Sequence, residues 1–304
     1  MLSDRIVFID GDFVAWDHAT VHIMCHSFGR GSAIFEVISF HNTDAGPVVF
    51  RLQEHIKRLF NSAALLDMEL SLSPDDFCRA VVGTIRKNEL KQGFIKLICY
   101  YPQFSLEIIP PKEPLSVSIF TIDPAKDLEG DFSAVLFTTA CISKWRKLDP
   151  QTVPIRAKAA ANYLNGMVAR LDAQKRGFAH AIMLDTQGFI AEGGTESVFL
   201  VKNGQLMTPF LGTVLESITR KSVLEAAQIE GIVVLEDRFL PELIYEAEEI
   251  FFASSPFKVL PARQVEDRVL ENVPGPVTQK MAVLMENIAT GKDDRFKDWL
   301  YPLD

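Results

Sequence analysis

Lys158 has the neighbours that most clearly predict chemistry, because it lies among small residues just ahead of an amphipathic helical pattern. The small residues around it in the segment RAKAAANYLN are Ala157, Ala159, Ala160 and Ala161. Close packing by these side chains would exclude water and lower the pKa of the lysine, and an amine that attacks a carbonyl group must be neutral. Lysine is almost never fully buried without a partner, so a solvated surface position is the alternative for Lys158 taken alone. The segment predicts a buried, reactive amine.

A second segment, IAEGGTESVFLV, begins at Ile190 and carries two carboxylates. Glu192 and Glu196 stand on either side of two glycines, between apolar runs, which is typical of a loop. Carboxylates on such a loop, together with the Lys158 segment, favour a catalytic site over an ordinary surface lysine.

A competing set of polar residues lies near the N-terminus, where His18, His22, Cys25 and His26 fall within nine residues. A histidine pair four residues apart can bind a metal ion if the segment is helical. No second ligand cluster follows at metal-site spacing, so we expect no metal and interpret His22 and His26 as packing or hydrogen-bonding residues.

Composition limits the class of protein. A formal net charge of -9 argues against nucleic acid or an anionic membrane surface as the main partner. This net charge does not exclude a local basic pocket. The four cysteines lie far apart without CxxC spacing, which favours reduced thiols in a cytosolic protein. The N-terminus is too charged for a signal peptide, and no run of 18 apolar residues occurs. We therefore expect a cytoplasmic location.

The elements that must position these residues form two α/β halves, as expected for a chain of 304 residues. In residues 1–122 the pattern predicts strands at 5–9, 13–16, 33–40, 48–52, 94–101 and 115–122, with helices at 53–66 and after Ser73. Ser73-Pro74-Asp75-Asp76 is a strong helix start, with a capping serine and acids at the positive end. Proline, glycine and charge at 123–131 indicate a linker.

Residues 132–304 alternate strand-like and helical runs, which indicates a second, mixed α/β domain. The expected strands are 134–140, 181–185, 198–201 and 232–236, with helices at 162–176 and 218–230. Asn203-Gly204 predicts a tight turn, and Gly231 predicts the end of the second helix.

Together these segments resemble the class IV aminotransferases, the family that includes branched-chain and D-amino-acid aminotransferases and aminodeoxychorismate lyase. The resemblance spans nearly the whole chain, through VVFRLQEHIKRLFNSA, the Lys158 and Glu192 segments, LESITRKSV, EEIFFASSPFKVLPA and GPVTQ. The closing stretch TGKDDRFKDWL looks like the end of bacterial branched-chain aminotransferases. The resemblance implies the two-domain fold type IV architecture, pyridoxal 5′-phosphate between the domains, and a homodimer or higher homo-oligomer that completes the site.

The resemblance also implies roles around the cofactor ring. Lys158 matches the Schiff-base lysine, which also serves as general base and acid. Glu192 matches the carboxylate that keeps the ring nitrogen protonated, while a structural role in holding the loop is expected for Glu196. Tyr163 matches the tyrosine that donates a hydrogen bond to O3′ of the ring. A packing aromatic on a helix face is the alternative for Tyr163.

Three separate segments match the groups that bind the cofactor's phosphate. They are Arg58, the helix start at Ile218 and Thr219, and the serines Ser254 and Ser255. A dianion needs a fork of donors, a hydroxyl and a helix N-terminus, which these residues could supply together. Each has an ordinary alternative: a helix-surface cation for Arg58, a cap for Thr219 and a turn residue for Ser255.

The chain departs from the branched-chain pattern where substrate is expected. Arg30-Gly31 replaces YG, FEVIS replaces FEGIR with Val37 and Ser39 at the changed positions, and Phe94-Ile95-Lys96 replaces tyrosine–isoleucine–arginine. We expect substrate contacts from Arg30, Phe35, Val37, Phe94 and Lys96, with Arg30 and Lys96 as carboxylate-binding cations. Outward-facing positions for both cations are the alternative.

The first interpretation of function is an aminotransferase that moves an amino group between a branched-chain or aliphatic amino acid, or glutamate, and a 2-oxo acid. A lyase acting on aminodeoxychorismate and a D-amino-acid or amine transaminase of the same fold are alternatives. A non-catalytic protein that binds pyridoxal phosphate is less consistent with the matches at Lys158, Glu192, Tyr163 and Arg58.

Overall fold

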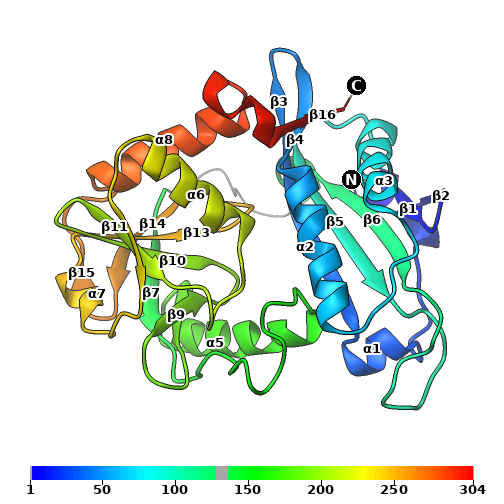
Figure 1. Cartoon of the computed structure of the whole chain (residues 1–304), viewed down its shortest axis with the longest axis horizontal. Helices are drawn as coiled ribbons and strands as arrows, with labels where there is room; N and C mark the ends of the chain where they lie inside the picture. The colour runs from blue at the N-terminus through cyan, green and yellow to red at the C-terminus, as the bar shows by residue number, and fades with distance from the viewer. Residues whose placement is uncertain (1, 128–135, 304) are drawn as a thin grey trace. The chain divides into compact units, whose positions relative to one another are not determined.

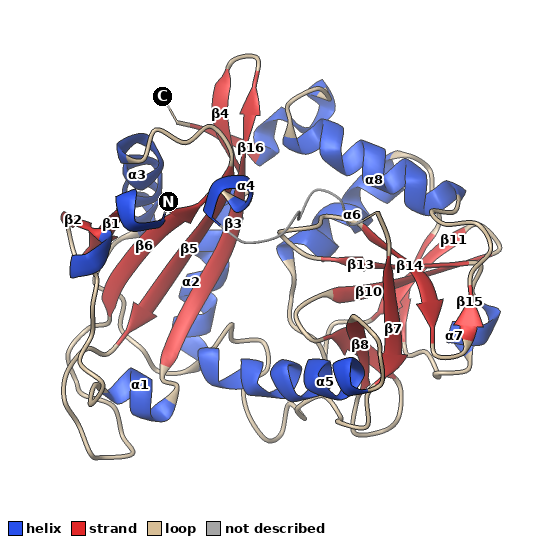
Figure 2. Cartoon of the chain, turned by 180° about the vertical axis from the view of Figure 1, so that it is seen from behind, coloured by secondary structure: helices blue, strands red, loops and turns tan. Residues whose placement is uncertain are grey.

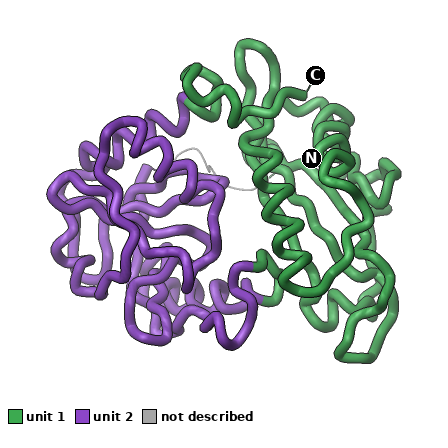
Figure 3. Tube along the Cα trace, viewed as in Figure 1, with its two compact units in different colours: residues 1–132, 157–161, 288–304 green, residues 133–156, 162–287 purple. Residues whose placement is uncertain are grey.

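The computed structural model describes residues 2–127 and 136–303, and the chain divides into two compact units (Figure 3). The first unit consists of Met1–Phe132, Ala157–Ala161 and Ile288–Asp304, and the second of Ser133–Arg156 and Asn162–Asn287. Residues 157–161 and 288–304 fall in the expected C-terminal domain, but they belong to the first unit because they pair with its strands. Of the expected linker at 123–131, Pro124–Asp127 forms the short helix α4, and residues 128–131 lie outside the described residues.

The first unit contains a seven-stranded sheet in the order β16-β4-β3-β5-β6-β1-β2. Its strands are β1 (Ile6–Ile9), β2 (Asp12–Ala15), β3 (Ala33–Thr43), β4 (Gly46–Phe50), β5 (Gly93–Tyr100), β6 (Ser116–Ile122) and β16 (Leu300–Pro302). All neighbouring strands are antiparallel. Along β5 and β6 buried and half-buried residues alternate strictly, because successive side chains of a strand point to opposite faces.

Two amphipathic helices, α2 (Leu52–Leu65) and α3 (Pro74–Lys87), cover one face of this sheet. Helix α2 lies in front of β3 and β5 in Figure 1 and behind them in Figure 2. The buried core between helices and sheet includes Ile38, Leu59, Phe77 and Ile95. Ser73 caps α3 as expected. Its hydroxyl accepts a hydrogen bond from the Asp76 amide, and the Asp76 carboxylate accepts one from the Ser73 amide. Shorter elements of this unit are η1 (Leu2–Asp4), η2 (Trp16–His18), α1 (His26–Arg30) and η4 (Asp294–Trp299).

Residues 157–161 lie beside the first half of β3, on the edge that β4 does not cover. Ala159 forms an isolated antiparallel bridge with Ile34 and joins the core of the first unit. The chain then enters η3 (Ala160–Asn162). The edge of β3 therefore carries the short segment that contains Lys158.

The second unit contains strands in the order β12-β11-β10-β13-β14-β7-β8-β9, with β15 paired to β14. They are β7 (Thr138–Ile142), β8 (His180–Leu184), β9 (Ile190–Gly193), β10 (Ser197–Lys202), β11 (Gln205–Pro209), β12 (Val234–Asp237), β13 (Glu249–Ala253), β14 (Leu260–Val265) and β15 (Arg268–Val269). Parallel pairs join β7 to β8, β7 to β14 and β11 to β12, and the other pairs are antiparallel. Residues 134–135 of the expected strand 134–140 lie outside the described residues.

The helices of this unit are α5 (Tyr163–Lys175), α6 (Ile218–Ile229), α7 (Leu243–Glu246) and α8 (Pro276–Ala289), of which α8 ends in the first unit. Small residues of α5, Ala169 and Ala173, pack on Cys141 and Met183 of β7 and β8. The mixed α/β class is confirmed. In the described part of the chain, no helix is both long and apolar enough to cross a membrane.

Candidate active site

Hydrogen bonds on both sides of its backbone hold Lys158 in place. Its amide donates to Ser62 Oγ at 3.0 Å, and its carbonyl accepts from the Phe35 amide at 3.1 Å. Ala157 and Ala159 are buried, but Lys158 itself is only half-buried and Ala160 and Ala161 are exposed. The expectation of a buried lysine closely packed by all four alanines is therefore wrong. In an extended segment alternate residues face opposite sides, so the buried alanines point to the core and the lysine points away from it.

The ring of Phe35 lies beside two amines of the first unit. Lys158 Nζ is 4.7 Å from the ring centroid and Lys96 Nζ is 5.4 Å from it. Lys96 on β5 faces Val37 on β3, and Phe94 faces Ser39, so Phe35, Val37, Phe94 and Lys96 share one face of the sheet. Burial, together with the positive charge of Lys158, lowers the pKa of Lys96. The structure thus groups four of the five expected substrate residues with Lys158.

Arg30, the fifth expected substrate residue, is exposed at the end of α1. In the part of the chain that the structure describes, its guanidinium makes one hydrogen bond, to the carbonyl of Leu106 at 3.1 Å. No described contact joins Arg30 to Phe35 or Lys96.

Arg58 on α2 forms a buried ion pair with Glu36 on β3. Its Nε donates to Glu36 Oε1 at 2.7 Å and its Nη2 to Oε2 at 2.6 Å. His55 Nδ1 lies 2.7 Å from the same Oε2. Burial alone would raise the pKa of Glu36, but the charge and hydrogen bonds of Arg58, with those of His55, hold it at about 2. Burial also lowers the pKa of His55. The hydrogen bond and negative charge of Glu36 raise this pKa, whereas the positive charges of Arg58 and Lys158 lower it further. Glu36 is therefore ionised, and a neutral His55 donates its Nδ1 proton to it.

One hydroxyl connects the arginine to the lysine. Ser62 Oγ donates to the carbonyl of Arg58 at 2.9 Å and accepts from the amide of Lys158. Because Ser62 is one turn after Arg58 on α2, the same helix orients the guanidinium and fixes the lysine backbone. Arg58 is thus a buried, positioned cation rather than the helix-surface cation that was the alternative.

Glu192 lies in the second unit, on strand β9 rather than on a loop. Pairing of Ile190 with Leu184 and of Gly193 with Ile182 extends the strand to the glycines, because a neighbouring strand supplies partners that the local sequence does not reveal. Glu192 is 8% exposed, and its Oε1 accepts from Lys147 Nζ at 2.5 Å. Its Oε2 accepts from the amide of Leu215 at 3.2 Å. Glu192 is thus held between a cation and the segment that leads into α6.

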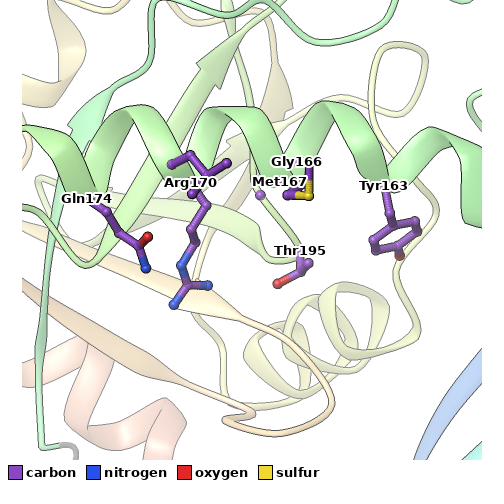
Figure 4. A pocket seen from close by; sticks show the side chains of 8 residues that line it. Tyr163, Gly166, Met167, Arg170, Gln174 and Thr195 are labelled. Carbon is purple, nitrogen blue, oxygen red and sulfur yellow. The ribbon is translucent and has the colours of Figure 1, made fainter.

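Tyr163 and the turn after Glu192 line one groove of about 340 Å³ (Figure 4). Tyr163 and Arg170 leave α5 on the same side, with Thr195 of the turn nearby. Helix and turn meet through their backbones, because a Cβ atom added to Gly166 would lie 2.1 Å from the carbonyl oxygen of Gly194. This close approach sets the distance between the helix that carries Tyr163 and the strand that carries Glu192.

Glu196 holds the same turn. Its carboxylate accepts from the amide and hydroxyl of Thr195, at 2.9 and 2.7 Å, and from Arg170 at 3.0 Å. His180 Nδ1 lies 3.4 Å away. Burial would raise the pKa of Glu196, but His180 and the bonds from Thr195 outweigh it and lower the value to about 2.

The expected phosphate-binding groups of the second unit lie at two neighbouring places. Ser217 caps α6 by accepting from the Arg220 amide, which leaves Ile218 and Thr219 as the first two residues of the helix. Helix termini have amides without intrahelical partners and a partial positive charge. Ser254 is buried and Ser255 half-buried, directly after β13, and β13 packs against α6. Each unit thus contains donors of the kind that a phosphate dianion binds: a helix terminus and hydroxyls in the second unit, and a buried arginine in the first.

The sequence interpretation missed several residues that position the others, above all Glu36, His55 and Lys147. His55 and Arg58 are three residues apart on the apolar face of α2, so both point at the sheet and need a buried acid. Glu36 is the acid within the apolar run of β3, and this pattern could have identified the pair. No comparable local signal marks Lys147, because it lies in an irregular segment 45 positions before Glu192.

Two of the three N-terminal histidines make ordinary hydrogen bonds. His26 Nδ1 lies 2.7 Å from Ser32 Oγ, and His22 Nδ1 accepts from the Met24 amide at 3.1 Å. Among residues 2–127 and 136–303, no group of three or more histidine, cysteine, aspartate or glutamate side chains could hold a metal ion.

Comparison with known proteins gives matches along the chain. The sequence model of the family amino-transferase class IV matches residues 33–265. The branched-chain-amino-acid aminotransferase of Salmonella typhimurium (strain LT2) is 32% identical over 300 residues, which cover 98% of this chain and 97% of that protein. The crystal structure of the branched-chain aminotransferase from Thermoproteus uzoniensis with norvaline has a TM-score of 0.93 at 32% identity and covers 99% of each chain. The branched-chain amino acid aminotransferase from Thermobaculum terrenum, in its PLP-form, has a TM-score of 0.92 at 26% identity and covers 100% of each chain.

Proposed function

Because this chain belongs to the class IV aminotransferases, we propose that it moves an amino group between branched-chain or other aliphatic amino acids, glutamate included, and 2-oxo acids. The expected fold type IV is confirmed by the same matches. The cofactor of the proposal is pyridoxal 5′-phosphate, which the PLP-form of the Thermobaculum terrenum structure supports. A cytoplasmic location and a homodimer or higher homo-oligomer are also part of the proposal.

Each unit has residues that would supply groups the cofactor requires. Arg58, the amides of Ile218 and Thr219, and the hydroxyls of Thr219, Ser254 and Ser255 would bind its phosphate. Glu192 would hold the proton of its ring nitrogen and Tyr163 would donate to O3′. When bound, the cofactor draws electrons away from the substrate's α-carbon into its ring.

Lys158 carries the proposal, because its amine would take a proton from the substrate's α-carbon and return it. Lys158 Nζ and Lys96 Nζ flank the same phenyl ring, and repulsion between two positive charges is mutual. The neutral amine of Lys158 is the form that would act as nucleophile and general base.

The face formed by Phe35, Val37, Phe94 and Lys96 suits both substrate types of the proposal. Its apolar side chains would contact an aliphatic chain, and its one cation would bind a carboxylate. Burial makes the carboxylate contact stronger than an exposed one, since water competes less.

Covalent labelling tests the central claim. Protein loaded with pyridoxal phosphate and reduced with borohydride should carry the cofactor on the peptide that contains Lys158. Lys158→Ala should retain part of its cofactor affinity, because the residues that would bind the cofactor's phosphate are unchanged. It should lose turnover. Lys96→Ala is the matched control, which should still be labelled. Label on Lys96 or Lys147, or no label, would contradict the proposal.

A half-reaction screen tests the substrate. Single-turnover rates are measured for L-leucine, L-glutamate, D-alanine and a simple chiral amine, with Lys96→Ala and Arg30→Ala. Lys96→Ala should slow the carboxylates, glutamate most, and spare the amine, whereas Arg30→Ala should change little because its guanidinium bonds a loop carbonyl. Faster reaction of D-alanine or the amine would favour those transaminase branches. Release of pyruvate from aminodeoxychorismate would favour the lyase.

A further inference from the structure

We propose that Lys147 is a positioning residue that acts through Glu192, keeping its carboxylate ionised and oriented before the cofactor's ring nitrogen arrives. The inference rests on the proposed function, because it gives Glu192 the task of holding that nitrogen's proton. Lys147 matters because a buried glutamate can perform this task only as an anion.

The contact is short and well protected from water. Lys147 Nζ lies 2.5 Å from Glu192 Oε1, and the two side chains are each 11% exposed. The second carboxylate oxygen accepts from the Leu215 amide at 3.2 Å. Lys147 is the charged group in contact with Glu192 in the described part of the second unit.

The backbone around Lys147 is tied to the sheet and to α5. Its amide donates to the carbonyl of Leu184 at the end of β8, at 2.8 Å. The next amide, that of Leu148, donates to the side chain of Asn165 on α5 at 3.1 Å. Helix α5 begins at Tyr163, so the segment that positions the cation is joined to the helix that carries the expected O3′ donor.

Burial of the Glu192 carboxylate has an energetic cost. A carboxylate removed from water binds a proton more readily unless a positive charge compensates it. Protonated Glu192 could not stabilise a proton on the ring nitrogen. The ammonium group of Lys147, 2.5 Å from the carboxylate, supplies such a compensating charge.

Lys147 and Lys158 have different described neighbours. Lys147 contacts the carboxylate of Glu192, whereas Lys158 shares the ring of Phe35 with Lys96.

The first experiment uses the protein without cofactor. The carboxyl carbons of glutamate are labelled with ¹³C and titrated by NMR, and the Glu192 signal is identified by its loss in Glu192→Gln. Lys147→Met should shift the Glu192 titration to higher pH by about one unit or more, whereas Lys147→Arg should keep it near the parent value. An unchanged Glu192 titration in Lys147→Met would overturn the inference.

The second experiment measures the dissociation constant of pyridoxal phosphate by equilibrium dialysis between pH 5 and 8. Lys147→Met should weaken binding about tenfold at the acidic end, because one pKa unit corresponds to a tenfold change in equilibrium. In a Glu192→Gln background the same change should have no pH-dependent effect. An equal effect in both backgrounds would show that Lys147 acts on something else and would refute the inference.

These experiments separate the inference from the proposed function. A protein that shows the NMR shift but binds no pyridoxal phosphate would retain the ion pair and refute the proposed function. If Lys147→Met does not fold, Lys147→Gln provides the same loss of charge with a polar side chain, and its titration decides the question.

Discussion

Replacing Glu36 with glutamine is expected to destabilise the first unit strongly, because the guanidinium of Arg58 would then face a neutral amide in a buried place. In the parent protein both donors of the ion pair reach Glu36, at 2.7 and 2.6 Å. Glu36 is fully buried and Arg58 is 8% exposed. Removing one partner of such a pair leaves an uncompensated charge out of water.

The pKa of Glu36 gives the magnitude. It is lowered from an ordinary value of 4.5 to about 2, and such a difference corresponds to about 3 kcal/mol of stability at neutral pH. Breaking a buried ion pair costs about 3 to 5 kcal/mol in general, which agrees. A carboxylate with a lowered pKa stabilises the folded state fully at pH values above its pKa in the unfolded chain. This contribution is lost as the pH falls toward its pKa in the folded protein. The difference between parent and Glu36→Gln should therefore be complete above about pH 4.5 and shrink toward pH 2.

The assay is thermal and urea denaturation of protein without cofactor. The unfolding transition of the first unit is monitored separately from that of the second unit. Glu36→Gln should lower its melting temperature by about 10 °C for a unit of this size. Asp294→Asn is the matched control, since its salt bridge to Lys297 is exposed and worth little. A loss no larger than that of the control would refute the argument for a buried, tightly coupled pair.

Three further changes test the second unit. Gly166→Ala should cost about 3 kcal/mol or more in denaturation, because the new Cβ would lie 2.1 Å from the Gly194 oxygen, whereas Gly29→Ala, with nothing within 4 Å, should be neutral. Equal melting of the two variants would contradict the close approach. Glu192→Gln should reduce turnover roughly a thousandfold without loss of folding, if its electrostatic contribution is like that of other preorganised groups; near-normal turnover would assign its task to another residue. The pKa of Glu196, at about 2, predicts that its stabilisation is present above about pH 4.5 and lost as pH falls toward 2. Glu196→Gln should therefore flatten the acid limb of stability, and an unchanged limb would show that the carboxylate is not coupled to folding.

Features with a local cause could be predicted from the sequence. Ser73 caps its helix as expected, because the partner residue is three positions away. Asn203 and Gly204 both adopt positive φ in the turn between β10 and β11, and Gly231 does so after α6. Phe94 and Lys96 are two residues apart in a strand-like run, and this spacing alone assigns them to one face of β5.

Features that join distant segments could not be predicted in this way. The strand position of Glu192 depends on pairing with β8, and its ion pair depends on a lysine far away in the sequence. The half-buried state of Lys158 depends on which side of β3 its segment occupies. Apolar neighbours indicate that a charged residue is buried, but they do not say which opposite charge it meets.

The connectivity of the first unit limits how the protein can be divided. The chain leaves this unit after residue 132, returns for residues 157–161 and returns again at residue 288. A fragment that ended at residue 132 would lack Lys158 and β16, and it would expose the edges of β3 and β4 that these segments cover. Unpaired strand edges promote aggregation. Neither half of the gene would therefore encode a soluble half-enzyme, whereas a circular permutant that keeps all three segments in one polypeptide could fold. Tolerance to permutation but not to truncation is the behaviour that this interleaved connectivity implies.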